Sequence, residues 1–106
     1  MVLIYVSLPE QHIAEKVAES LLKERLANHI NILPKIRCLL YNEEKQQVEH
    51  TGETILLIKT KALLYRAIEE KLNEMHLTVA TKIFSMPITQ ISNGYYDQLV
   101  HGILKV

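Results

Sequence analysis

Several features that particular functions need are scarce or missing in this chain of 106 residues. Its single cysteine, Cys38, cannot form an internal disulfide, so nothing in the chain requires an oxidising compartment. Its three glycines form no glycine-rich loop, which argues against a backbone cradle for a nucleotide phosphate. The sequence also has no nucleophile elbow, no Cys-x-x-Cys pair and no His-x-x-x-His pair, and we therefore predict that it is not an enzyme.

The chain has no excess charge of either sign, because 12 Lys and Arg residues balance 12 Asp and Glu residues. Without a net positive field, nucleic-acid binding loses its usual electrostatic support, so we predict no nucleic-acid partner. The segment from Met1 to Ser7 has no basic residue, and its apolar run is far too short for a signal peptide or a membrane span. We expect a cytoplasmic protein with no membrane contact.

What the chain does have is an ordinary globular composition, with 48% hydrophobic residues. At this length we expect a single domain over residues 1–106. The core of so small a domain gives modest stability, which association of subunits would increase.

Apolar periodicity predicts a strand and then an amphipathic helix in the first quarter of the chain. Val2 to Leu8 is almost continuously apolar, which is typical of a strand with both faces covered. Ser7 and Pro9 then predict the start of a helix, with Ser7 able to act as its cap. Helical spacing predicts a buried stripe made of Ile13, Ala14, Val17, Ala18, Leu21 and Leu22.

Residues 30–60 predict a long β-hairpin. The alternation from Ile30 to Leu40 indicates one long, bent strand, with Pro34 at a bulge or an edge. We place on one side of this strand Ile30, Ile32, Pro34, Ile36, Cys38 and Leu40. Asn42 to Lys45 is a polar turn, and Val48 to Thr60 returns as the second strand.

The remaining elements complete a known arrangement. A second helix is marked by Leu64, Ala67, Ile68, Leu72 and Met75. A fourth strand follows from Val79 to Pro87, and a short helix from Tyr95 to about Ile103. This order predicts an α+β fold, a ferredoxin-like βαββαβ sandwich with a long central hairpin and a C-terminal helix.

The hairpin is longer than the other strands can cover. Its protruding half carries the apolar side chains of Ile36, Leu39, Leu40 and Tyr41. Since an exposed apolar flap with unpaired edges is unfavourable in a monomer, we predict that neighbouring copies of the chain cover it.

Two segments, Leu26 to Pro34 and Glu53 to Thr60, resemble strand signatures of the CutA family of divalent-cation tolerance proteins. The matching residues are Leu26, Ala27, Asn31, Ile32, Pro34, Glu53, Leu56, Ile58, Lys59 and Thr60, joined later by His76, Ile83, Tyr95 and Leu99. The resemblance covers essentially the whole chain. It implies a PII/CutA-like homotrimer.

The chain departs from the family pattern at several positions. His29 replaces a Cys and Lys35 a Gly, while Cys38, Leu40 and Asn42 stand where the hairpin has Ser, Tyr and Trp. Leu77, Thr78, Thr81 and Gln98 replace Pro, Tyr, Pro and Trp. The chain is therefore identified as a divergent member.

The resemblance implies a copper site at His76, which matches a family position in the cleft between subunits. Met75 adds a soft thioether and His29 retains the capacity to bind metal. Alternatively, Met75 continues the apolar stripe of its helix, His76 ends that helix and His29 is a packed, hydrogen-bonded histidine. Val6 stands where the family places a thiolate, so any copper or other divalent metal should bind weakly.

Lys59 follows the buried run from Ile55 to Ile58, and a cation there needs an anionic partner or a solvent-filled cleft. The resemblance places it near the inter-subunit cleft, to which we also assign Glu53 and Tyr41. Its partner could be Glu53, a carboxylate of the next subunit or an anionic ligand, and a purely structural ion pair is equally open.

Three functions are compatible with these features. The resemblance favours a trimer that binds a metal ion or small ligand in its clefts and serves copper tolerance or response. A PII-like regulatory module and a purely structural trimer without a metal role are the alternatives. Fold-level analogy does not choose among them.

Overall fold

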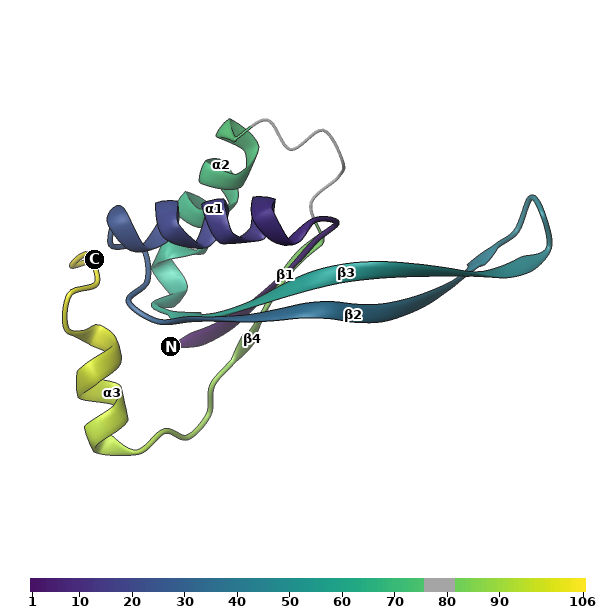
Figure 1. Ribbon diagram of the computed structural model, residues 1–106. Helices are drawn as coiled ribbons and strands as arrows, with labels where there is room; N and C mark the ends of the chain where they lie inside the picture. Colours follow the sequence, from purple (N-terminus) through teal and green to yellow (C-terminus); the bar gives the residue numbers. More distant parts are fainter. Residues whose placement is uncertain (76–81) are drawn as a thin grey trace.

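A computed structural model describes residues 1–75 and 82–106 of the chain. Its elements are β1 (Val2–Leu8), α1 (Gln11–Lys23), β2 (Ile30–Asn42), β3 (Gln47–Thr60), a 3₁₀ turn η1 (Ala62–Leu64), α2 (Tyr65–Glu74), β4 (Lys82–Pro87) and α3 (Asn93–Val100). The strands form one antiparallel sheet in the order β2-β3-β1-β4. Helices α1 and α2 cover one face of this sheet (Figure 1). The predicted ferredoxin-like α+β arrangement is confirmed.

The hydrophobic core lies between the sheet and these two helices. Alternate residues of β1 and β3 point into it, and every third or fourth residue of α1 and α2 meets them. Its fully buried members include Ile4, Val6, Val17, Leu21, Leu56, Ile58 and Ile68. Full burial of a side chain of this size stabilises the fold by about 1.5–3 kcal/mol, so this layer dominates the energetics.

The start of α1 differs from the prediction. Ser7 remains in β1 and is buried, and the helix begins at Gln11 with Glu10 in the N-cap position and no side-chain cap. The alternation of β1 continues through Leu8, so it takes precedence over the capping signal of Ser7. Leu22 was wrongly placed in the buried stripe: it is exposed, because the stripe of α1 runs through its neighbour Leu21.

A β-bulge at residues 34–35 changes which side chains of β2 share a face. Leu33 pairs with Ile55 and Ile36 with Glu53, so β2 has one residue more than β3 between these pairs. Lys35 adopts a positive φ of 58° there. The extra residue shifts the alternation by one position. The prediction that the alternating residues of this strand all lie on one side is therefore wrong. Ile36, Cys38 and Leu40, which follow the bulge, lie on the opposite face from Ile30 and Ile32.

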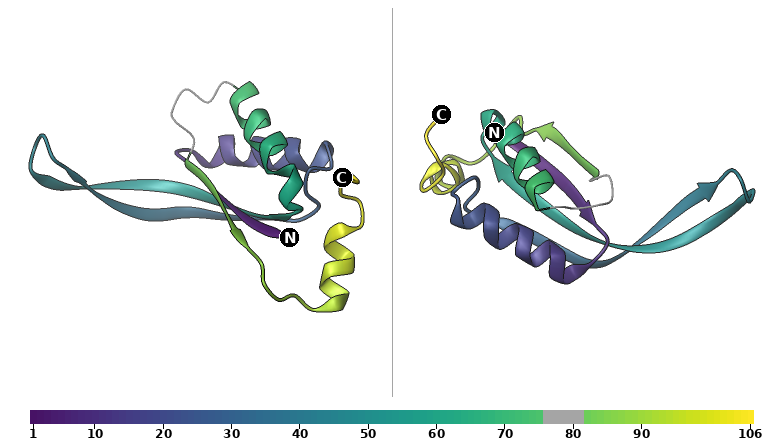
Figure 2. Two further views of the ribbon diagram at one scale, coloured as in Figure 1. Left: turned by 180° about the vertical axis from the view of Figure 1, so that it is seen from behind. Right: turned by 90° about the horizontal axis from the view of Figure 1, so that it is seen from above.

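The hairpin of β2 and β3 extends well beyond the rest of the sheet (Figures 1 and 2). Only the part of β3 from Thr54 to Thr60 pairs with β1, whereas the ladder between β2 and β3 continues to the pair Asn42 and Gln47. Near the tip, Tyr41 is paired with Val48 and is 59% exposed. The protruding apolar flap is thus confirmed.

The C-terminal part departs from the predicted bounds by a few residues. The described part of the fourth strand begins at Lys82, and the predicted positions 79–81 lie outside the described residues. Helix α3 begins at Asn93 and ends at Val100, earlier than predicted at both ends. The amide nitrogen of Asn28 donates to the carbonyl oxygens of Gln98 and His101 at 2.6 and 2.7 Å, which fixes the end of α3 beside the start of β2.

Candidate functional site

The face of the sheet away from α1 and α2 carries an apolar platform, defined as Leu3, Tyr5, Leu33, Leu57, Phe84 and Met86. The strand register places these residues together, because paired positions of antiparallel strands point to the same side. Tyr5 stacks on Phe84 with ring centroids 4.7 Å apart. Phe84 is 47% and Met86 44% exposed, so within one chain this platform is incompletely covered.

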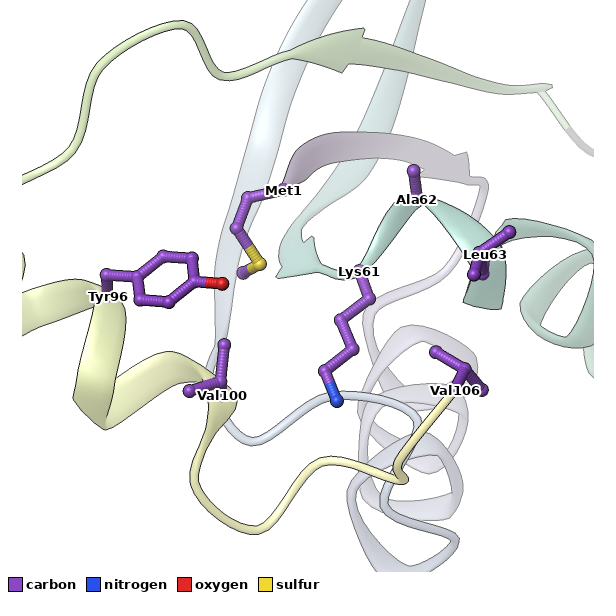
Figure 3. Close-up of a pocket in the computed structure, with 7 residues that line it drawn as sticks. All are labelled: Met1, Lys61, Ala62, Leu63, Tyr96, Val100 and Val106. Carbon is purple, nitrogen blue, oxygen red and sulfur yellow. The ribbon is translucent and has the colours of Figure 1, made fainter.

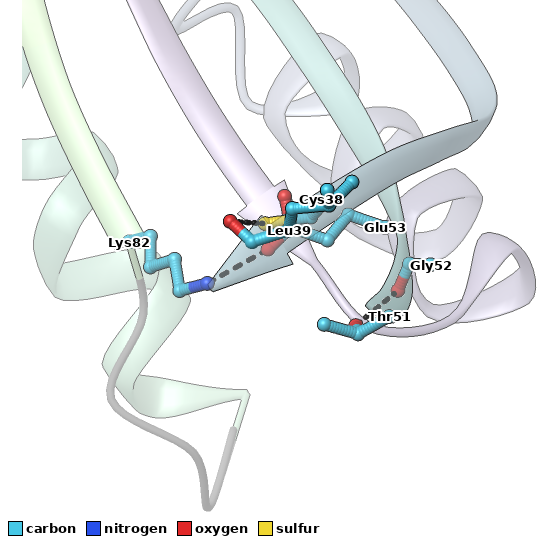
Figure 4. A network of polar contacts seen from close by, with 6 residues as sticks. All are labelled: Cys38, Leu39, Thr51, Gly52, Glu53 and Lys82. Atoms are coloured by element: carbon cyan, nitrogen blue, oxygen red, sulfur yellow. Dashed lines mark hydrogen bonds and ion pairs between the residues drawn. The ribbon is translucent and has the colours of Figure 1, made fainter. Parts of the chain in front are cut away.

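Glu53 and Lys82 form an ion pair at the edge of the platform toward the hairpin (Figure 4). Their side-chain oxygen and nitrogen atoms are 2.7 Å apart, and the Glu53 side chain is 11% exposed against 62% for Lys82. The hydrogen bond from Lys82 lowers the pKa of Glu53 below its usual value, with further hydrogen bonds from Ser7 and Cys38 acting in the same direction. The same contact raises the pKa of Lys82.

Lys59 lies at the opposite end of the same face. Its Nζ donates to Oδ1 of Asn31 at 2.9 Å and lies 5.7 Å from the ring centroid of Tyr95. The second distance is within the range of a cation–π interaction. A partner for this cation was predicted, but it is an amide and an aromatic ring rather than a carboxylate.

The suggested pair between Lys59 and Glu53 is wrong. Both residues lie on β3, too far apart along the strand for their side chains to meet. Glu53 instead forms an ion pair with Lys82. Sequence reasoning also missed Asn31 as the partner of Lys59. The contact depends on the register of β2 against β3, in which Asn31 pairs with Leu57 and is a diagonal neighbour of Lys59. The sequence pattern did not specify this register.

Tyr41 is far from Lys59 within one chain, because it lies near the tip of the hairpin whereas Lys59 is close to the end of β3. The amide of Asn42 hydrogen-bonds the carboxylate of Glu49 beside it, which ties the two strands together at the tip. The grouping of Tyr41 with Lys59 and Glu53 can therefore arise only between copies of the chain.

The structure describes two of the three predicted metal ligands, His29 and Met75, and does not bring these two together. His29 is exposed just before β2, while Met75 ends α2 and packs against the hydrophobic core. The start of β2 and the end of α2 lie apart in Figures 1 and 2. His76 lies outside the described residues. Across residues 1–75 and 82–106, no group of three or more His, Cys, Asp or Glu residues is placed to hold a metal ion.

Cys38 is half-buried on the same face as Glu53, and its Sγ is 4.0 Å from the carbonyl oxygen of Leu39 (Figure 4). The nearby hydroxyl of Thr51 donates to the carbonyl oxygen of Gly52 at 3.3 Å. Together with Glu53 and Lys82 these residues form a compact polar cluster where β3 leaves the main sheet.

Within the described ranges, no helix is long and apolar enough to span a membrane.

Comparison with known proteins gives a consistent result. The chloroplastic Protein CutA of Arabidopsis thaliana is 32% identical over 98 residues, which is 92% of this chain and 53% of that protein. The divalent-cation tolerance protein CutA of Thermus thermophilus is 28% identical over 96 residues, covering 91% of each. The chain spans about half the length of the Arabidopsis, mouse and human relatives.

Solved structures agree. The crystal structure of CutA1 from Oryza sativa has a TM-score of 0.87 at 26% identity and covers 99% of this chain and 94% of the other. CutA1 from Pyrococcus horikoshii has a TM-score of 0.86 at 26% identity, with coverage of 99% and 100%. The family described as "CutA1 divalent ion tolerance protein" matches residues 2–101. This chain therefore belongs to the CutA1 divalent ion tolerance protein family.

Proposed function

We propose that this protein is a CutA-like homotrimer that binds a metal ion or a small ligand in its inter-subunit clefts and acts in tolerance of, or response to, divalent metals such as copper. The observation that supports assembly is the incompletely covered platform together with the protruding hairpin. Phe84, Met86 and Tyr41 all expose large apolar side chains. Both protruding strands also present backbone groups beyond the end of β1, which another copy can pair or cover.

The clefts of this assembly are assigned to Lys59, Glu53 and Tyr41. The hairpin is longer than its own sheet, so its tip can carry Tyr41 to the open face of a neighbouring copy. The ammonium of Lys59 has three N–H groups, one of which Asn31 accepts. The remaining donors suit an anionic group, supplied by a ligand or by the next subunit.

Copper is the metal that we assign to the site, with His76 as its main ligand and Met75 and His29 as weaker donors. The chemistry of imidazole and thioether groups suits copper ions. Val6 is fully buried in the core and has no donor atom, so this position of the first strand adds no ligand to the site. We therefore expect weak binding that falls as imidazole protonates near its reference pKa of ~6.5.

A copper titration tests this assignment. Cuprous and cupric ions should bind wild type weakly at neutral pH and less at mildly acidic pH, and His76→Ala should abolish most of the binding. His12→Ala, at an exposed histidine of α1, is the matched control and should bind as wild type does. Tight binding that survives His76→Ala would show that other residues are the ligands.

A PII-like regulatory module, or a structural trimer without a metal role, is the second candidate. The observation that favours it is the protruding hairpin, whose exposed Leu39 and Tyr41 side chains offer a contact surface for a partner protein. Absence of copper binding in both wild type and His76→Ala would select this candidate. In either case we propose a binding protein without catalytic activity.

We place the protein in the cytoplasm, although the CutA of Archaeoglobus fulgidus, a structural neighbour at 25% identity, is described as periplasmic. Cell fractionation with an antibody against the chain tests this location. Recovery in a periplasmic or organellar fraction would contradict it.

A further inference from the structure

A cavity of about 410 Å³ opens between the start of β1, the turn after β3, helix α3 and the C-terminal segment (Figure 3). Four apolar side chains that line it are Met1, Leu63, Val100 and Val106. Its volume lies within the range of about 300–1,000 Å³ that is typical of small-ligand sites. Leu63 is 76% exposed, so much of the apolar lining is open to solvent. An apolar ligand body would cover that surface.

Two polar groups converge on the same cavity. Figure 3 shows the Tyr96 hydroxyl pointing inward beside Met1 and the Lys61 ammonium pointing inward between Val100 and Val106. The Nζ of Lys61 donates to the carbonyl oxygen of Leu104 at 2.9 Å. An ammonium has three N–H groups, so donors remain for a ligand. Among the described residues that line the cavity, Lys61 has the one charged side chain, so its ammonium is the group that an anionic ligand would contact.

We propose that this cavity binds a small amphipathic monocarboxylate. Its carboxylate accepts hydrogen bonds from the Lys61 ammonium and the Tyr96 hydroxyl, and its short hydrocarbon tail lies against Met1, Leu63 and Val100. A charged head group opposite an ammonium forms a stronger hydrogen bond than a neutral one. The apolar lining buries the hydrocarbon tail, which adds to binding in a way that an inorganic anion cannot.

This site is separate from the cleft assigned to Lys59. Tyr95 and Tyr96 are neighbours on α3, but the ring of Tyr95 faces Lys59 whereas the hydroxyl of Tyr96 points into the cavity of Lys61. Binding at one site can therefore be measured without altering the residues of the other, and the inference does not depend on copper binding.

Octanoate is the probe, applied to the full chain in its native oligomeric state and followed by NMR of the labelled methyl groups of Met1, Leu63 and Val100. Acetate tests the head group alone and octan-1-ol the uncharged tail. We expect octanoate to shift these methyl signals saturably, and Lys61→Met to weaken its binding by about tenfold or more, with octan-1-ol unaffected. Tyr96→Phe should produce a smaller loss in the same direction.

Three variants control this experiment. Lys105→Met removes a neighbouring charge outside the cavity, Tyr95→Phe alters the adjacent tyrosine, and both should bind octanoate as wild type does. Lys61→Arg keeps the charge and should retain binding, which separates the role of charge from the contact with Leu104. Equal affinity for octan-1-ol and octanoate, loss of binding in Lys61→Arg as large as in Lys61→Met, or unshifted methyl signals at millimolar octanoate would each overturn the proposal.

Discussion

At the scale of single residues, the pair of Glu53 and Lys82 is asymmetric. Exposed ion pairs contribute little to stability because solvent screens them. Here only Lys82 is well exposed, while the carboxylate of Glu53 is largely enclosed, and Ser7 and Cys38 add to the effect of Lys82 in lowering its pKa. Because this carboxylate is enclosed, the pair should contribute more to the stability of the fold than an ion pair between two exposed side chains does.

Acidification should destabilise the fold through Glu53. The pKa of this carboxyl is lowered in the folded protein from its ordinary value of 4.5, so its contribution is present above that value and disappears as pH falls through the lower folded pKa. Urea midpoints measured at about pH 6 and about pH 3 should therefore fall less in Glu53→Gln than in wild type. Glu44→Gln, in the exposed turn of the hairpin, is the control and should follow wild type. Equal falls in wild type and Glu53→Gln would contradict this account.

Lys59→Met should reduce anion binding more than it reduces stability. Methionine fills the volume of the lysine stem but removes the charge, the bond to Asn31 and the cation over Tyr95. Because the bond is exposed, we expect the free energy of unfolding to fall by about 1 kcal/mol or less.

The control for Lys59 is Asn31→Ala, which removes the amide partner but keeps the cation. It should retain anion binding while losing a similar amount of stability. Calorimetry with phosphate and thermal melting of the three proteins give the comparison. A large loss of stability in Lys59→Met with unchanged binding would indicate a purely structural role.

At the scale of elements, periodicity predicted the helices and strands because burial imposes a period of two or 3.6 residues on the sequence. Periodicity failed at the bulge, because the extra residue moves the following side chains to the other face of the sheet although the alternation of apolar residues in the sequence is unbroken. The pairing of Glu53 with Lys82 was equally invisible, because the two residues meet only when β4 lies beside β1 and β1 beside β3. Local patterns thus predict elements better than they predict partners.

The bulge also yields a prediction at this scale. Lys35 holds a φ of 58°, a conformation that costs a residue with a side chain about 1–2 kcal/mol and glycine almost nothing. Lys35→Gly should therefore stabilise the protein by up to about 1 kcal/mol after the greater entropy of the unfolded glycine is deducted. Arg37→Gly, at a regular position of β2, should instead destabilise it by about 0.5–1 kcal/mol. Chemical unfolding measures both changes, and a loss of stability in Lys35→Gly would contradict the strain.

At the scale of the whole molecule, one chain leaves two apolar surfaces uncovered. The platform around Tyr5 and Phe84 lies on one face of the sheet, and Tyr41 lies near the tip of the hairpin. The hairpin projects to one side of the molecule (Figure 2). The core between the sheet and the helices is complete within one chain, and we propose that other copies of the chain cover these two surfaces. Association through them would also create the clefts to which we assign Lys59 and Glu53.

The molar mass in solution tests this claim most directly. Light scattering at micromolar concentration should give about three times the 12.2 kDa of one chain. A variant with Leu39→Ser and Tyr41→Ser should shift toward smaller species while keeping the circular dichroism of the folded chain, since both side chains are exposed within one subunit. A wild-type protein that remains a stable monomer at micromolar concentration would contradict the trimer, and with it the clefts and the function assigned to them.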